Sequence, residues 1–341
     1  MKLLPLYSEM SRRRWPQKII HTMQHADFAL NEQNWRDLRL PRPDHAIRSD
    51  PYVGGHYSLG VKFDRLISLF EVIIPRIANP AVIVYGDCDT AVLGAWSAKR
   101  MGLKVIHVEA GLRCGDMGMK EEQNRVMVDS LSDVLLAPTY DACDNLCRSG
   151  FSADSISMAG NLMIDCMMKV KYPKNAVKKY TVLTLHRPAN VDDAAHLKKI
   201  LRVVNAHCRK VIFPVHPRAG SSLGGFNPKS YKNISFSEPM PYSRFINLLS
   251  RSRLLITDSG GCQEEAGVMG LPCITFRRST ERPVTLSLTN RLAPTFDHLR
   301  SYLKKLPDIT KRIEPSELTG WNGDAAQRIC EAIEYEYKAT G

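Results

Sequence analysis

The sequence lacks a long hydrophobic run, and no apolar stretch approaches the roughly 20 residues that a membrane-spanning helix needs. It also lacks internal repeats and low-complexity segments. Its 44% hydrophobic and 24% charged residues are typical of an ordinary folded protein. We therefore expect no membrane span, and the length of 341 residues favours two domains over one.

Cysteine forms no informative pattern. The nine cysteines are an odd number, they are scattered, and no apolar leader-like stretch precedes them. We therefore expect a cytoplasmic protein with reduced thiols rather than a secreted disulfide framework. Cys143 and Cys147 are spaced like neighbours on one helix face, but no further His or Cys pair completes a zinc-type set. We predict no metal site.

Acidic residues are outnumbered, with 35 Asp and Glu against 47 Lys and Arg and a net charge of +12. Such a balance suits an anionic ligand, a nucleic acid or an acidic surface. The basic clusters at residues 12–14 and 169–179 lack the interleaved aromatic residues of a single-strand binding platform. We interpret both clusters as solvated basic faces and expect no nucleic-acid partner.

Short apolar runs alternate with longer helical patterns in both halves, which is typical of βαβ units and parallel sheets. In the first half, strands are predicted at 18–21, 81–86, 104–109 and 134–137, with helices that include 60–77 and 90–101. In the second half, strands are predicted at 180–185, 211–215, 233–236, 254–257 and 272–276. Parallel sheets bind ligands outside the carboxyl ends of their strands, so two such sheets facing each other predict one deep cleft.

The predicted α/β organisation has four parts. Residues 1–168 form a first Rossmann-like domain, 169–179 a lysine-rich linker, 180–320 a second Rossmann-like domain, and 321–341 a C-terminal helix. One feature is unusual, because residues 1–10 have a helical pattern and no strand precedes them. Either the first strand of this domain is absent, or this half is built unusually.

A glycine-rich turn is predicted where the strand at 254–257 meets a helix. Ser259, Gly260 and Gly261 would point backbone amides at an anion, and the Ser259 hydroxyl would add a donor. Glu265, one turn into the helix, is a candidate acceptor for ribose hydroxyls. The alternative is an ordinary βα turn with a serine cap.

Three carboxylates are predicted near adjacent strand ends. Asp87 follows one strand, Glu109 ends the next, and Glu121 lies twelve residues further on. Their mutual repulsion could raise the pKa of one of them towards neutrality, as general acid–base chemistry requires. The alternative is that Glu109 and Glu121 form structural ion pairs with Arg113 and Arg125. For Glu122 we favour a structural role.

Cationic and polar side chains are predicted at the strand ends of the second half, where they could neutralise a departing diphosphate. A lone histidine at such a place is more often packed or capping. The candidates are His186, Arg187, His216, Arg277, Arg278, Glu281 and Arg282.

Eight motifs, in order along the chain, together resemble the bacterial and archaeal UDP-N-acetylglucosamine 2-epimerases from Lys2 to about Arg282. They are H-V-E-A-G-L-R, E-E-x-N-R, L-S-D-x-L-L-A-P-T, A-G-N-L-M-I-D, L-H-R, P-V-H-P-R, T-D-S-G-G-x-Q-E-E and T-E-R-P. The resemblance implies the GT-B fold, two Rossmann-like domains facing across a deep cleft, with the C-terminal helix after Trp321 crossing back to the first domain.

The resemblance also implies a cofactor-free reaction. In this family UDP-N-acetylglucosamine loses its C2 proton and UDP, and the 2-acetamidoglucal is reprotonated on the other face and rejoined to UDP. The product, UDP-N-acetylmannosamine, serves surface polysaccharide or glycan synthesis. Family members are often homodimers, and many bacterial members are activated by UDP-N-acetylglucosamine near a G-Q-H segment.

Residues of this chain carry these roles by resemblance. The acid–base and diphosphate residues are Asp87, Glu109, Glu121 and His186. The substrate-binding residues are Lys2, Arg113, Arg125, His216, Phe245 (beside uracil), Ser259, Gly260, Gly261, Glu265 and Arg282.

Departures from the family pattern leave alternatives open. The family's opening strand and G-T-R-P-E motif have no counterpart, and Met23 replaces the glycine of G-Q-H. Ala189 and Val284 stand where the family has glutamates in H-R-x-E-N and E-R-P-E. An active epimerase is the first expectation. A non-catalytic nucleotide-sugar-binding member is the second, a hydrolysing epimerase that releases N-acetylmannosamine and UDP is the third, and a glycosyltransferase on the same fold is less favoured.

Overall fold

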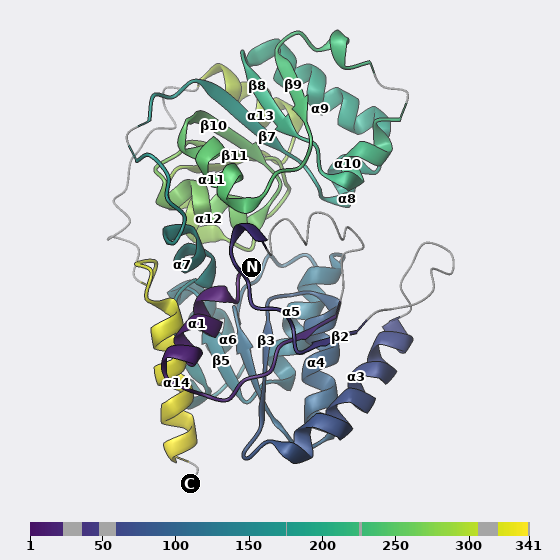
Figure 1. Ribbon diagram of the computed structural model, residues 1–341. Coiled ribbons are helices and arrows are strands. Elements are labelled where there is room, and N and C mark those ends of the chain that lie inside the picture. Colours follow the sequence, from purple (N-terminus) through teal and green to yellow (C-terminus); the bar gives the residue numbers. More distant parts are fainter. Residues whose placement is uncertain (23–35, 48–58, 175, 225–226, 306–319, 340–341) are drawn as a thin grey trace. The chain divides into compact units, whose positions relative to one another are not determined.

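The computed structural model describes residues 1–22, 36–47, 59–174, 176–224, 227–305 and 320–339. Two compact units are present, each built on a parallel sheet (Figure 1). The first holds the described parts of 1–31, 39–162 and 323–341, and the second those of 32–38 and 163–322. No helix in the described ranges has the length and apolar character that a bilayer crossing requires.

The first unit alternates strands and helices along the chain. Its elements are α1 (Leu4–Arg12), β1 (Ile20–His21), β2 (His45–Ala46), α3 (Leu59–Ile73), η1 (Ile74–Arg76), β3 (Ala81–Tyr85), α4 (Asp89–Arg100), β4 (Lys104–Val108), α5 (Lys120–Leu131), β5 (Val134–Ala137), α6 (Tyr140–Arg148), η2 (Ala153–Ser155), β6 (Ile156–Met158) and α14 (Ala325–Ala339). Strands β3, β4, β5 and β6 form a parallel sheet in that order, and β1 pairs with β2 in a small parallel sheet of its own.

Two hydrophobic clusters cover opposite faces of the four-stranded sheet, because successive residues of a strand point to opposite faces. Val105 belongs to the cluster formed with α3 and α4, whereas its neighbour Ile106 belongs to the cluster formed with α1 and α14. The C-terminal helix α14 thus packs on the first sheet, where Arg13 also pairs with Glu334 at 2.8 Å. Strands buried on both faces consist almost wholly of apolar residues, as β5 does.

The second unit repeats the alternation. Its elements are α7 (Leu162–Met168), β7 (Tyr180–Thr184), α8 (Pro188–Val191), α9 (Ala194–His207), β8 (Val211–Pro214), α10 (Pro217–Ser222), η3 (Pro228–Ser230), β9 (Ile234–Ser237), α11 (Tyr242–Ser250), β10 (Ser252–Thr257), α12 (Gly260–Val268), β11 (Cys273–Thr275), η4 (Pro283–Ser287), β12 (Asn290–Leu292) and α13 (Phe296–Lys304). Its parallel sheet has the order β12-β11-β10-β7-β8-β9. The order reverses between β7 and β10, and ligands bind at such a reversal in doubly wound sheets.

Most predicted strands agree with the structure to within one or two residues. The predicted helix 60–77 is shorter, because Pro75 lacks the amide hydrogen that an α-helix needs, and α3 gives way to the 3-10 turn η1 at Ile74. Strands β2, β6 and β12 were not predicted, since they are short and have no continuous apolar run. The predicted α/β fold with two parallel sheets of GT-B type is confirmed.

Candidate functional site

Two predicted carboxylates of the first unit lie at the same edge of its sheet. Tyr85 and Val108 are register partners at the ends of β3 and β4, so Asp87 and Glu109 follow neighbouring strands. Glu109 has a φ of +75° and is only 7% exposed. Gly86, at φ +69°, lies beneath it, because a Cβ there would come within 3.0 Å of Glu109 Oε2. The left-handed turn at Glu109 thus holds the carboxylate in a fixed place over Gly86.

Lys2 lies beside Glu109 in the first unit. Its Nζ lies 3.9 Å from Glu109 Oε2 and 5.1 Å from the centre of the Tyr85 ring. The Lys2 side chain is 34% exposed, so it can turn towards either the carboxylate or a ligand. The structure therefore brings the predicted residues Lys2 and Glu109 together.

Helix α5 supplies the partner of Asp87. Arg125 forms a short ion pair with Asp87 and a second one, at 2.6 Å, with Glu122. Asn124 donates a hydrogen bond to the backbone oxygen of Asp87 at 3.0 Å. Asp87 remains 35% exposed while Arg125 is only 3% exposed, so Arg125 holds Asp87 from beneath.

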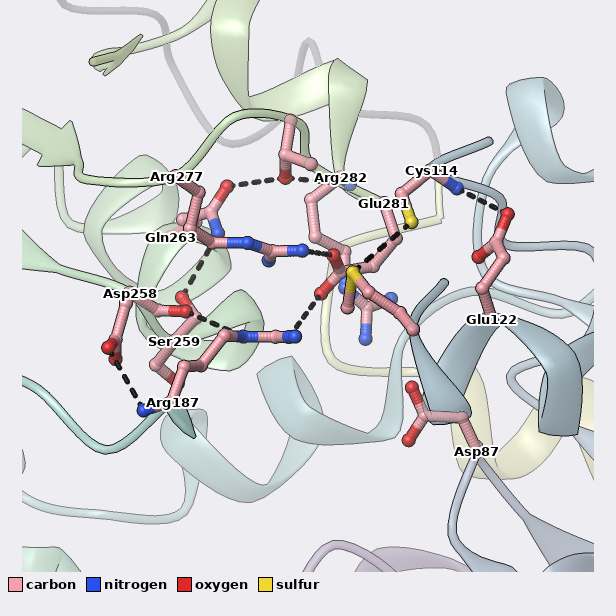
Figure 2. A network of polar contacts seen from close by, with 12 residues as sticks. Asp87, Cys114, Glu122, Arg187, Asp258, Ser259, Gln263, Arg277, Glu281 and Arg282 are labelled. Carbon is pink, nitrogen blue, oxygen red and sulfur yellow. Dashed lines mark hydrogen bonds and ion pairs between the residues drawn. The ribbon is translucent and has the colours of Figure 1, made fainter. Parts of the chain in front are cut away.

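The surroundings of Glu122 agree with the structural role that we favoured for it from the sequence. Its Oε1 accepts a hydrogen bond from the backbone amide of Cys114 at 2.8 Å (Figure 2) and another from that of Gly115 at 2.8 Å. Burial alone would raise the pKa of Glu122, but the Gly115 amide, the Arg125 guanidinium and the Cys114 amide outweigh burial and lower it. Its neighbour Glu121 is half-buried, and its side chain forms no hydrogen bond or ion pair with the described part of the chain.

A buried network that the sequence did not predict lies behind these carboxylates. Asp129 Oδ1 is 2.6 Å from Nδ1 of His107, and Asp129 Oδ2 is 2.6 Å from Arg113. Asp129 also accepts a hydrogen bond from the Gly111 amide at 3.2 Å, and the other ring nitrogen of His107 lies 3.1 Å from the Gly86 oxygen. One carboxylate therefore ties together the segments that carry Asp87, Glu109 and Arg113.

The alternative ion pairs considered for this unit differ from the observed ones. Arg113 pairs with Asp129 rather than Glu109, and Arg125 pairs with Asp87 and Glu122 rather than Glu121. Arg125 lies one helical turn after both Glu121 and Glu122, so spacing alone fits a pair with either one. In the structure, the side-chain directions favour Glu122. Glu109 and Glu121 are thereby left to other roles.

In the second unit, helix α12 begins with the predicted glycine-rich turn. Ser259 is its N-cap, and the serine hydroxyl accepts from the Cys262 amide at 3.5 Å. A Cβ on Gly260 would lie 2.3 Å from Glu281 Oε1, and one on Gly261 would lie 3.0 Å from the terminal methyl carbon of Met163. Position 260 therefore needs glycine for space, whereas a side chain at Gly261 would require only a small shift of the flexible end of Met163. The exposed amides of a helix start are well suited to an anion.

Asp258, just before this turn, organises the end of β7. Its buried carboxylate accepts hydrogen bonds from the amides of His186 (3.1 Å) and Arg187 (3.0 Å) and from the Asn190 side chain (3.0 Å). His186 Nδ1 lies 3.1 Å from the same carboxylate. Burial would raise the pKa of Asp258, but the His186 side chain and the other donors outweigh it and lower the pKa.

The two predicted histidines of the second unit lie together. The ring centres of His186 and His216 are 5.7 Å apart. His216 caps α10, its Nδ1 accepting from the Arg218 amide at 3.2 Å, so it fills the capping role considered for it. His186 is 40% exposed and directed by Asp258, which leaves its other ring nitrogen for a ligand.

A buried cluster of charged residues surrounds the glycine-rich turn (Figure 2). Glu281 lies 2.7 Å from Arg277 and 3.6 Å from Arg187, whose Nε also donates to the Asp258 oxygen at 3.1 Å. Arg282, a predicted substrate residue, is 5% exposed and lies 3.1 Å from Glu264. The sequence placed these residues at one edge but did not predict their pairing. Arg187 lies 94 positions from Glu281, whereas Arg277 lies only four positions from it.

Glu265 is almost fully buried and has a tyrosine partner. The Tyr242 hydroxyl donates to Glu265 Oε1 at 2.8 Å, and burial together with the nearby Glu265 charge raises the pKa of Tyr242. Phe245, on the next turn of α11, is half-buried. The structure thus places Glu265 against α11, the helix that carries Phe245.

Two further expectations concern a metal site and the segment that corresponds to the family's G-Q-H. Within the described ranges, no group of three or more His, Cys, Asp or Glu side chains is arranged to hold a metal ion. Residues 23–25, which replace the family's G-Q-H segment, lie outside the described residues.

Comparison with known proteins agrees with the resemblance. Residues 8–334 match the family model of UDP-N-acetylglucosamine 2-epimerase. A UDP-N-acetylglucosamine 2-epimerase of Methanocaldococcus jannaschii is 32% identical over 98% of this chain and 96% of that protein. A UDP-2,3-diacetamido-2,3-dideoxy-D-glucuronate 2-epimerase of Pseudomonas aeruginosa is 35% identical over 77% of this chain and 75% of its own length.

A solved structure is similar over nearly the whole chain. It is the crystal structure of Methanocaldococcus jannaschii UDP-GlcNAc 2-epimerase in complex with UDP-GlcNAc and UDP, with a TM-score of 0.84. Its sequence is 32% identical, and the match covers 98% of this chain and 96% of that one. On these matches, the chain belongs to the UDP-N-acetylglucosamine 2-epimerase family.

Proposed function

We propose that this protein interconverts UDP-N-acetylglucosamine and UDP-N-acetylmannosamine by inverting C2 of the sugar. Family membership and the similar structure that holds UDP-GlcNAc and UDP support the proposal. The single observation that carries it is the pair of carboxylates Asp87 and Glu109 on adjacent strand ends, with Glu109 held over Gly86. A C2 hydrogen is poorly acidic, and its removal needs a base in a fixed position.

In the proposed mechanism, residues of the first unit act on the sugar. One carboxylate among Asp87, Glu109 and Glu121 takes the C2 proton while the bond from C1 to UDP breaks, leaving 2-acetamidoglucal. Another returns a proton to the opposite face of C2, and UDP adds back to C1. Lys2, beside Glu109, and Arg125, beneath Asp87, hold these carboxylates in position. Arg113 acts through Asp129 rather than by direct contact.

Residues of the second unit are proposed to hold UDP. His186, oriented by Asp258, and the amides of the Ser259 turn stabilise the negative charge that develops on the leaving diphosphate. Glu265 binds the ribose hydroxyls, and the Phe245 ring lies beside uracil. His216 supports His186, while Arg282 shapes the turn through Glu264.

The departures from the family pattern fit this proposal in physical terms. We propose that His186 and the α12 amides meet the diphosphate charge. Asn190 of the altered H-R-x-E-N segment still binds Asp258. We further propose a cytoplasmic homodimer that supplies surface polysaccharide or glycan precursors and binds no nucleic acid, with domains at 1–168 and 180–320.

A second sugar substrate is supported by the Pseudomonas aeruginosa relative, whose name states a diacetamido glucuronate. The same C2 chemistry applies to both sugars, since each carries an acetamido group there. They differ at C3 and at C6, where the glucuronate bears a carboxylate. Parallel turnover of the two nucleotide sugars decides which one is the substrate.

Product analysis by proton NMR tests the proposal. Incubation with UDP-N-acetylglucosamine is expected to give the anomeric signal of UDP-N-acetylmannosamine, with no free sugar. Free N-acetylmannosamine together with UDP would identify a hydrolysing enzyme. No turnover, with UDP still raising the thermal unfolding midpoint, would identify a non-catalytic binding protein.

A further inference from the structure

The amino ends of the strands in the second unit carry unpaired positive charge, at the edge of the sheet opposite to Ser259. Backbone contacts bring the segments together: Lys179 donates to the Arg251 oxygen at 2.9 Å, Thr181 to the Lys210 oxygen at 3.1 Å, and Val211 to the Asn233 oxygen at 2.7 Å. The side chain of Arg253 reaches the Arg209 oxygen at 3.0 Å. We call the side chains of Arg209, Lys210, Lys232, Arg251 and Arg253 the basic edge.

In the described part of the chain, no carboxylate pairs with the basic edge. The loops before the strands of this sheet, at 169–179, 208–210, 223–233, 251, 269–272 and 288–289, contain no Asp or Glu, and the first of them contains five lysines. None of the five side chains of the basic edge forms an ion pair with a residue that the structure describes. At the carboxyl edge, by contrast, Arg218 pairs with Asp192 and Arg277 with Glu281.

A groove lies within this edge. It has a volume of about 460 Å³ and is lined by Arg209, Lys210, Lys232, Tyr180, Asn233 and Ser235, among others. Arg209, Lys210 and Lys232 are exposed, so their charges are available to a partner. Lys and Arg side chains with a nearby serine hydroxyl suit a phosphate group.

We propose that the basic edge docks the protein on the anionic phospholipid face of a membrane, with headgroup phosphates in the groove. One exposed apolar side chain lies in the lysine-rich segment close to the edge: Val177, 73% exposed, comes two residues before Lys179, whose amide donates to the Arg251 oxygen. Lys178 and Lys179 beside it can meet lipid phosphates while the Val177 side chain enters the interface. A single-stranded nucleic acid fits less well, because Tyr180 is the one aromatic side chain that lines the groove and its hydroxyl is bound to the Leu248 oxygen.

Vesicle co-sedimentation tests this docking surface on the full chain. Wild-type protein is expected to bind vesicles of phosphatidylglycerol mixed with phosphatidylcholine but not vesicles of phosphatidylcholine alone. High salt is expected to release it from the anionic vesicles. The triple variant Arg209→Glu, Lys210→Glu, Lys232→Glu should bind at least about 100-fold more weakly, at roughly fivefold per charge. Its epimerase turnover should be unchanged, because none of the three residues belongs to the proposed catalytic or UDP site.

A matched control separates a local patch from overall charge. The variant Arg65→Glu, Arg148→Glu, Arg202→Glu changes the net charge equally at exposed arginines outside the basic edge. It should retain vesicle binding. Equal losses in the two variants, no binding of the wild type to anionic vesicles, or binding of the basic edge to single-stranded RNA in place of vesicles would each overturn the proposal.

Discussion

His107 Nδ1 lies 2.6 Å from Asp129 Oδ1, and neither side chain exposes more than 1% of its surface. Through Asp129 and His107, the ends of β3 and β4 are joined to α5, so the two strand ends that carry Asp87 and Glu109 are fixed by one buried carboxylate. A base that must reach a single carbon depends on such fixed surroundings, because small displacements of a reacting group are costly.

We expect Asp129→Ala to lower the free energy of unfolding by about 3 to 5 kcal/mol, since it leaves buried donors and the Arg113 charge without their acceptor. Urea denaturation measures the loss. Asp133→Ala is the matched control, because Asp133 is 33% exposed in its pair with Lys99, and it should cost about 1 kcal/mol. Equal losses of unfolding free energy in the two variants would show that the buried network around Asp129 stabilises the fold no more than an exposed ion pair does.

Gly260→Ala should weaken UDP binding by at least about tenfold, because the new methyl group would lie 2.3 Å from Glu281 Oε1 and displace the turn, and a buried polar contact is worth about 1 to 3 kcal/mol. Isothermal titration with UDP measures the effect. Gly220→Ala, in α10, has its nearest neighbour at 3.8 Å and should bind UDP like the wild type. Unchanged affinity in Gly260→Ala would remove the Ser259 turn from the UDP site.

The lowered pKa of Glu122 predicts a dependence of stability on pH. Since the folded pKa lies below the ordinary value of 4.5, the unfolded chain binds more protons on acidification. The contribution of Glu122 is therefore fully present above about pH 5 and is lost as the pH falls through the folded pKa.

We expect Glu122→Gln to be less stable than the wild type at neutral pH, and the difference to shrink steadily below pH 5. Urea denaturation at several pH values measures it. A difference that stays constant from neutral to acid pH would contradict the assigned charge of Glu122.

Tyr242→Phe removes the donor to Glu265 Oε1 and should weaken UDP binding by about threefold to tenfold, the worth of one typical intramolecular hydrogen bond. Tyr180→Phe is the control, because its hydroxyl binds the Leu248 oxygen at the opposite edge of the same sheet. If both variants bind UDP equally, Glu265 has no part in holding the nucleotide.

Much of the fold could be predicted from the sequence, because buried parallel strands such as β5, with the sequence Val-Leu-Leu-Ala, appear as continuous apolar runs. Family membership could also be predicted, and the matches confirm it. The strands β2, β6 and β12 could not, since they are short and have no continuous apolar run. The roles given to the site residues stay predictions.

Charge pairing was beyond the sequence for a physical reason. Arg187 and Glu281 are 94 positions apart, and His107 and Asp129 are joined across a strand and a helix, so no local spacing indicates either pair. The reversal of strand order between β7 and β10 explains why His186 and Ser259 emerge side by side. The strand order is set by the whole sheet, so no single sequence motif predicts it.

Deuterium incorporation at C2 tests the central claim most directly. Incubation with UDP-N-acetylglucosamine in deuterium oxide, followed by NMR, should show deuterium at C2 of both epimers with the wild type. Glu109→Gln should show none, while UDP still raises its thermal unfolding midpoint. Absence of C2 deuterium in wild-type protein that binds UDP, or full exchange in Glu109→Gln, would contradict the account.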